Sequence, residues 1–150
     1  MQEFVLAFTG SFCAGLLFNV RGRRLFLTGL SGVLGWMVYI WASGITGSSM
    51  ISIFAGAVAV GIFSETAARL FKSPATLFSI PGIFPIVPGI AAYETIQFLF
   101  SDELQNAGEK IVETLSGAGA IAFGILLVTA VFRFFSRKRY TRYGGRVHKE

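Results

Sequence analysis

Long apolar runs, separated by short clusters of charged residues, dominate the pattern along the chain. Residues 4–20 and 114–132 contain no Asp, Glu, Lys or Arg, and residues 25–64 form one charge-free run. Because one membrane crossing needs about 20 residues, that run is long enough for two spans, and the stretch SGITGSS (residues 43–49) supplies a turn between them. A further apolar segment covers residues 74–100.

The pattern therefore predicts an all-α, polytopic membrane protein with five transmembrane helices. We expect them at about residues 4–20, 25–42, 50–65, 74–100 and 114–132, with a break in the fourth near 81–89. Composition agrees, since 53% of the 150 residues are hydrophobic and only 14% are charged, against roughly 25% charged in soluble domains. We interpret residues 1–132 as a single transmembrane domain and residues 133–150 as a basic cytoplasmic tail.

Basic residues lie almost entirely on one side of the predicted spans. Three arginines follow the first span, Arg69 and Lys72 follow the third, and seven basic residues lie in the tail, so that only Lys110 of the 13 Lys and Arg lies on the other side. The positive-inside rule then predicts an outside N-terminus and a cytoplasmic C-terminus, in a multi-pass protein of the plasma membrane. Residues 101–113 are expected to form an outside loop.

The basic tail RFFSRKRYTRYGGRVHKE admits two interpretations. Clustered arginine and lysine are typical of a nucleic-acid-binding surface. Directly after a hydrophobic span, they are better explained as a topology signal and a contact with anionic lipid headgroups. We therefore expect membrane lipid, and no nucleic acid, as a partner of the tail.

The uncharged stretch SIPGIFPIVPG (residues 79–89) holds three prolines and two glycines. Pro81, Pro85 and Pro88 each remove a backbone donor and crowd the carbonyl four residues earlier, so the helix is predicted to break here. An unsatisfied backbone group in hydrocarbon costs several kcal/mol, and a broken segment has to be covered by protein or by a watery cavity. The stretch should therefore face inward.

This break falls near the middle of the fourth span. Secondary transporters place substrate sites at such breaks, with half-helix N-termini aimed at anionic groups. A second half-helix that begins near Pro88 and Gly89 would offer its amides to a carboxylate. A merely bent helix, with prolines that serve only packing, is the alternative.

Glu94 is the only carboxylate well inside an apolar segment. Charged groups in the membrane mark ion or proton paths, which makes Glu94 a proton-coupling candidate. The alternative is that Glu94 begins the outer interface, where it would be hydrated. Tyr93 and Gln97 either hydrogen-bond a substrate or lie at the membrane boundary.

The residue groupings of enzymes are missing from the sequence. It has no Ser/His/Asp or Cys/His set and no cluster of residues with metal-ligand spacing, and its single histidine lies in the tail. We therefore expect no catalytic residues, no metal, no cofactor and no enzymatic activity.

Four motifs in order resemble the threonine/serine exporter family, and within it the small-subunit, YjjB-like branch. They are FNV (residues 18–20), a basic loop, GLSGVLGW (29–36), and P-x-x-P-G with a tyrosine four residues further on (85–93). The resemblance implies export of small carboxylate-bearing metabolites, threonine and serine or succinate-like dicarboxylates, driven by the proton gradient. The substrate-binding residues that it implies are Pro81, Pro85, Pro88, Gly89, Tyr93 and Asn19. Glu94 has no counterpart among these positions.

Five helices are few for alternating access, in which one bundle usually rocks against another. We therefore expect a complex with a larger multispan subunit of the same family, and the sequence leaves open whether copies of this chain also associate. In this hypothesis the chain is a transporter subunit. The alternative is a non-transporting scaffold that stabilises a multispan partner, because small-xxx-small stripes such as Ser11-xxx-Gly15 and Ala57-xxx-Gly61 would serve either role.

Overall fold

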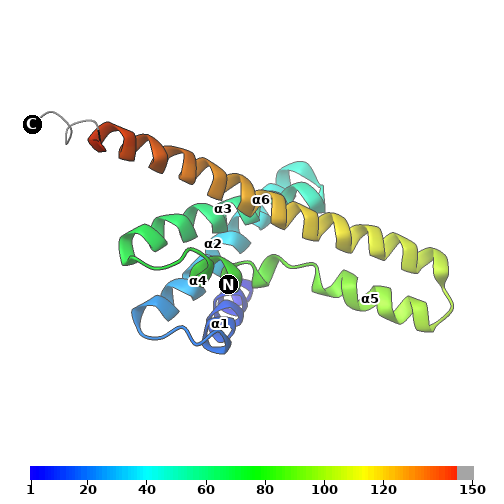
Figure 1. The fold of residues 1–150 in the computed structure, drawn as a ribbon. Helices are drawn as coiled ribbons and strands as arrows, with labels where there is room; N and C mark the ends of the chain where they lie inside the picture. The colour runs from blue at the N-terminus through cyan, green and yellow to red at the C-terminus, as the bar shows by residue number, and fades with distance from the viewer. Residues whose placement is uncertain (145–150) are drawn as a thin grey trace, which may run out of the picture.

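The chain folds into α-helices joined by short connections (Figure 1). The computed structural model describes the backbone of residues 1–144 and the side chains of residues 1–135, and no strand occurs in that part of the chain. The elements are α1 (Gln2–Leu17), α2 (Arg23–Thr46), α3 (Ser49–Phe71), α4 (Thr76–Gly82), the 3-10 turn η1 (Phe84–Ile86), α5 (Gly89–Phe100) and α6 (Leu104–Gly144).

Three helices are long and apolar enough to cross a membrane: α2, α3 and the Leu104–Phe135 part of α6. The segments Thr76–Ile86 and Gly89–Phe100 pass the same test together as one broken span, which makes four. Helix α1 has 16 residues, a length of about 24 Å against a hydrocarbon core of about 30 Å. The all-helical membrane architecture is confirmed at this level, and the five-span count stays a prediction.

The turn predicted between the second and third spans is confirmed, although it is shorter than residues 43–49. Helix α2 continues to Thr46 and ends at Gly47, whose φ of 61° is left-handed and whose N–H donates to the Ser43 carbonyl at 3.0 Å. Glycine suits this position because it has no Cβ to clash in that conformation.

Two predicted loops are wrong, because helices run through them. Helix α3 continues to Phe71, so most of the connection expected between the third span (50–65) and the fourth (74–100) is helical, and Lys72 ends the helix with a φ of 49°. The fourth segment then begins at Thr76, two residues after the predicted start at Pro74. Helix α6 begins at Leu104, where an outside loop over 101–113 was expected.

Pairing between α5 and α6 explains the second of these differences. Ala107 is 1% exposed, α5 packs along α6, and Lys110 Nζ lies 2.8 Å from Glu94 Oε2, so a charged segment is held as a helix by contact with its neighbour. At the other end α6 passes through the start of the predicted 133–150 tail and continues to Gly144. The remainder of that tail, residues 145–150, lies outside the described residues.

Small residues hold the helices close together. A Cβ at Gly32 of α2 would collide with the Ser11 side chain of α1, and one at Gly35 would lie 2.5 Å from Val60 Cγ2 of α3. A Cβ at Gly124 of α6 would lie 3.0 Å from Ala57 Cβ of α3. The stripes seen in the sequence therefore pack this chain's own helices, as close backbone approach in lipid requires.

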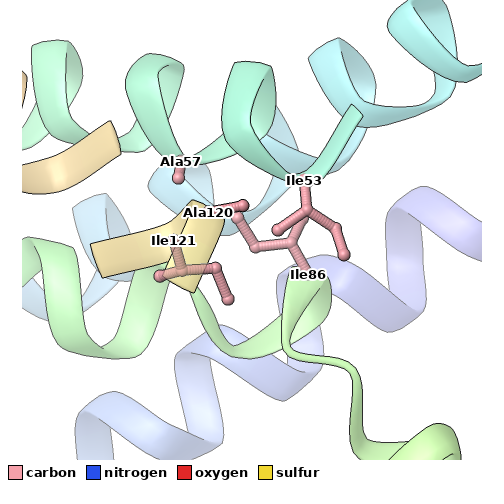
Figure 2. Close-up of a cluster of buried hydrophobic side chains, with 5 residues drawn as sticks. All are labelled: Ile53, Ala57, Ile86, Ala120 and Ile121. Atoms are coloured by element: carbon pink, nitrogen blue, oxygen red, sulfur yellow. The ribbon is translucent and has the colours of Figure 1, made fainter. Parts of the chain in front are cut away.

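The 3-10 turn of the broken segment lies in the hydrophobic core. Figure 2 shows Ile86 of η1 among side chains from α3 and α6. The cluster consists of Ile53, Ala57, Ile86, Ala120 and Ile121. Ile86, directly after Pro85, is thus fixed by two long helices.

Candidate functional site

The break in the fourth segment lies where the prolines predict it. Helical structure stops at Ile86, Val87 is extended, and Pro88 has a φ of −74° and a ψ of 59°. A new helix starts at Gly89, and the two halves differ in direction by 57°. The hypothesis of a broken rather than a merely bent helix is therefore confirmed.

One expected feature of the break differs in detail. The Gly89 amide donates to the Val87 carbonyl at 2.7 Å, closing a tight turn around Pro88. The amide at the very start of α5 is therefore already used by the chain. On the other side of the break, the Ile83 amide donates to the Ser79 carbonyl at 3.0 Å, so Pro81 sits inside α4 without ending it.

The first half of the break is covered by protein, as predicted. Pro81 and Gly82 are buried, and a Cβ at Gly82 would meet the Ser31 hydroxyl of α2 and lie 3.0 Å from Val60 Cγ1 of α3. Ser31 Oγ is buried and has no hydrogen-bond partner among the described residues. Such a hydroxyl is costly to bury unpaired, which makes it a polar point beside the break.

Pro85 borders a small hollow of about 310 Å³ between α1, α2 and η1. The indole nitrogen of Trp36 is buried beside it and, within the described part of the chain, has no acceptor. The remaining lining residues are Leu6, Ala7, Gly10 and Phe84, which are not polar, and Glu3, which carries a charge. A charged solute has little to bind in this hollow.

The second half of the break is more open than the sequence suggested. Gly89 has no atom within 4 Å of the position its Cβ would take, and Tyr93 is 68% exposed. Pro88 and Ala91 are held, since a Cβ at Gly117 of α6 would lie 2.9 Å from Pro88 Cγ and Ala91 is 5% exposed. The expectation that the whole stretch faces inward is therefore right for Ser79, Pro81, Gly82 and Ile86, which are buried. It is wrong for Ile80, Phe84 and Gly89, which are exposed.

The structure does not bring Asn19 to the other candidates. It lies after the end of α1, opposite to the end that faces Pro85, and its side chain accepts a hydrogen bond from Arg21 Nε at 3.1 Å. Its φ of 58° fits the connection between α1 and α2, because asparagine tolerates this conformation better than most residues. A substrate-binding role for Asn19 stays a prediction.

Glu94 lies on the α5–α6 pair and has a cationic partner. Lys110 Nζ is 2.8 Å from Glu94 Oε2 and 3.1 Å from Glu113 Oε2, with about a third of the Glu94 and Lys110 side chains exposed. The geometry favours an ion pair that joins the two helices. The geometry does not test proton coupling through Glu94. The following measurement decides between that role and a purely structural ion pair.

Replacing Glu94 by glutamine should leave the pH dependence of efflux unchanged. The pair to Lys110 is partly exposed, and pairs of this kind contribute about 0.2–1 kcal/mol to stability, so the variant should also fold. The measurement is initial efflux rate against pH for Glu94→Gln and wild type. A displaced pH profile would assign proton coupling to this carboxylate.

Long apolar helices, one of them broken within the membrane-length segment, place the chain in the class of helical membrane proteins. The family model described as Threonine/Serine exporter, ThrE, matches residues 3–131, from α1 into the second half of α6. The chain belongs to the threonine/serine exporter family.

A curated relative supports the same assignment. The threonine/serine exporter of Corynebacterium glutamicum is 29% identical over 101 residues, which are 67% of this chain and 20% of the relative. The chain therefore matches about a fifth of the length of that relative. No solved structure matches the chain.

Sequence reasoning did not assign Ser31, Trp36 or Gly117 to the surroundings of the break. Ser31 and Trp36 lie in the GLSGVLGW motif (residues 29–36), which the sequence connects to the proline stretch only through the order of the motifs along the chain. The available signal was that both segments contain small residues. Gly82, beside Pro81, allows close approach of another helix, and Ser31 is a small residue that can pack there.

Proposed function

We propose that the chain is one subunit of a secondary transporter that exports small carboxylate-bearing metabolites through the plasma membrane. Threonine and serine are the first substrates to consider, and succinate-like dicarboxylates the second, with the proton gradient as the driving force. The observation that carries the proposal is a broken fourth segment in a member of the exporter family.

The break supports transport for a physical reason. Irregular backbone at membrane depth is tolerated only where protein covers it or where it lines a cavity, and transporters use such points for binding. Here Pro81 and Gly82 of α4 are covered by α2 and α3, whereas Gly89 at the start of α5 is open. We assign the solute route to this open side.

A larger multispan subunit of the same family is the proposed partner. The match to only a fifth of the curated relative supports it, because that relative has much more chain than this one. The outer face of α5 supports it too, with Ile90, Tyr93 and Ile96 each more than half exposed. In the complex this face would pack against the partner or border the route.

The proposed topology has five spans and an outside N-terminus, so the α2–α3 turn should be outside and the α3–α4 connection inside. Cys13 is the single cysteine, which makes Cys13→Ser a cysteine-free background. In that background Ser49→Cys should react with a membrane-impermeant maleimide in intact cells, and Ser73→Cys only after permeabilisation. The reverse labelling pattern would mean that the topology is inverted. Equal labelling would mean that no span lies between the two positions.

Export is tested by reconstitution. Proteoliposomes that hold this chain and its partner should release radiolabelled threonine or serine when a proton gradient is imposed, and liposomes with the partner alone should not. Equal efflux from liposomes with the partner alone would mean that this chain is a non-transporting scaffold. Parallel loading with succinate decides between the two substrate classes.

A further inference from the structure

A polar hollow lies between α3, α4 and α6, away from the α1-side hollow at Pro85. Its volume is about 580 Å³. It shares a wall with a second hollow of about 700 Å³, which continues between α4 and α6 as far as Ile83 and Ala118. The space exists because α4 packs on α2 and α3 rather than on α6.

Charged and hydroxyl groups gather in this α3/α4/α6 hollow. The ones that carry the argument are Ser64, Glu65, Arg69, Thr76, Ser79 and Arg133. Ser79 lies two residues before Pro81, so the first half of the broken span forms one wall of the hollow. The other walls come from the C-terminal part of α3 and from the middle of α6.

Its two arginines differ in how they are held. Arg69 Nη2 donates to the Phe132 carbonyl at 2.9 Å, and its guanidinium carbon lies 4.8 Å from the centre of the Phe132 ring, which fixes the side chain at the rim. Arg133 is the next residue of α6. Within residues 1–135 neither arginine forms an ion pair with a carboxylate, even though Glu65 is one helical turn from Arg69.

Ser64 provides the second, independent sign of a ligand. The residue is 1% exposed, it lines the hollow, and Ser64 Oγ has no hydrogen-bond partner among the described residues. A buried hydroxyl without a partner is normally avoided. A rotation of the Ser64 side chain toward the hollow would let a polar atom of a bound solute satisfy it.

We propose that this hollow is a binding site for a small zwitterion, with its carboxylate on Arg133 and Arg69, its ammonium group on Glu65, and a further polar atom on Ser64. A guanidinium group binds a carboxylate through charge-assisted, often bidentate hydrogen bonds. A dicarboxylate would place its second negative charge against Glu65. The site therefore favours an amino acid over succinate.

The site rests on the proposed export function only for its role as the loading side of the route. Arg24 Nη2, in the first turn of α2, donates to the Phe71 carbonyl at the end of α3 at 3.4 Å, so the hollow lies at the same end of the bundle as the start of α2. In the proposed topology that end is cytoplasmic, where an exporter collects its substrate.

Binding is measured with the full chain in phosphatidylcholine nanodiscs, using tritiated L-threonine as the probe and unlabelled succinate as competitor. We expect saturable threonine binding that weakens about tenfold or more in Arg133→Ala, because a charge-assisted contact is lost. Arg21→Ala is the control, an exposed arginine outside the hollow, and should bind as wild type does. Glu65→Gln should weaken threonine and improve competition by succinate.

Ser64→Ala keeps the test informative if a charge variant fails to fold. It removes an unpartnered hydroxyl, so the free protein should keep its melting temperature while its affinity for threonine falls. Unchanged binding in Arg133→Ala, Glu65→Gln and Ser64→Ala would overturn the site. Loss of wild-type binding in nanodiscs with phosphatidylglycerol would overturn it too, by assigning the hollow to a lipid headgroup.

Failure of the site and failure of the proposed function give different results. Binding that follows the expected pattern, without efflux from the reconstituted complex, rejects export and keeps the site. Efflux that is normal in Arg133→Ala and Ser64→Ala keeps export and rejects the hollow as the loading side of the route.

Discussion

Replacing Gly56 by leucine is expected to destabilise the helical bundle by forcing α2 and α3 apart. A Cβ at this position would lie 2.9 Å from the backbone carbonyl oxygen of Gly35, 3.4 Å from Tyr39 Cβ and 3.5 Å from Ile86 Cδ1. A backbone carbonyl cannot rotate away as a side chain can, so the two helices would have to separate. The same substitution would push on Ile86 and hence on the break.

Overpacking of this kind typically costs about 1–3 kcal/mol. For a chain of this size that corresponds to a fall of about 2–12 °C in melting temperature, read from the loss of the monodisperse peak in detergent after heating. The matched control is Gly44→Leu, in α2, where no atom lies within 4 Å of the added Cβ. Equal losses in the two variants would mean that the α2–α3 contact is not as close as described.

Replacing Gly89 by leucine should slow efflux strongly without affecting the fold. No atom lies within 4 Å of the Cβ that would be added, and the residue does not have a left-handed φ, so the chain has room for the side chain. If the route passes the open start of α5, a leucine there narrows it at the break. We expect the initial rate of threonine efflux to fall about tenfold or more, an increase in barrier of about 1.4 kcal/mol.

Gly119→Leu is the control for this experiment. Gly119 lies on α6, is exposed, and also has no atom within 4 Å of its added Cβ. The two variants thus add the same apolar volume to two open surfaces, and only the one at the break should lose transport. Normal efflux in Gly89→Leu, at matched protein levels, would move the route away from α5.

The break was predictable because its cause is local. Proline cannot donate a backbone hydrogen bond, so three prolines within eight residues interrupt a helix whatever packs around it. The left-handed turn at Gly47 is local for the same reason. By contrast, the helical state of residues 104–113 depends on α5, which pairs with α6 and places Lys110 beside Glu94. No short window of the sequence shows that these two residues meet.

The candidate site was predicted only in part, for a related reason. The order of motifs along the chain does not show which of them lie close together in space. Asn19 and Pro85 both belong to such motifs, but Asn19 follows the end of α1 that is far from the hollow at Pro85. The polar hollow could not be predicted because the predicted third span ends too early. The charge pattern ends the third span at residue 65 and places Arg69 after it, whereas α3 continues to Phe71 and carries Arg69 into the wall of the hollow that Glu65 and Ser64 also line.

The central claim is that the broken fourth segment borders a watery solute route, and cysteine reactivity at the break tests it most directly. In the Cys13→Ser background, Gly89→Cys is labelled in native membranes with a water-soluble maleimide, and Gly119→Cys serves as the lipid-facing comparison. We predict that Gly89→Cys reacts readily, that excess threonine slows the reaction, and that Gly119→Cys reacts poorly in both conditions. An inert Gly89→Cys would contradict the account, because it would place the break against lipid rather than along a route.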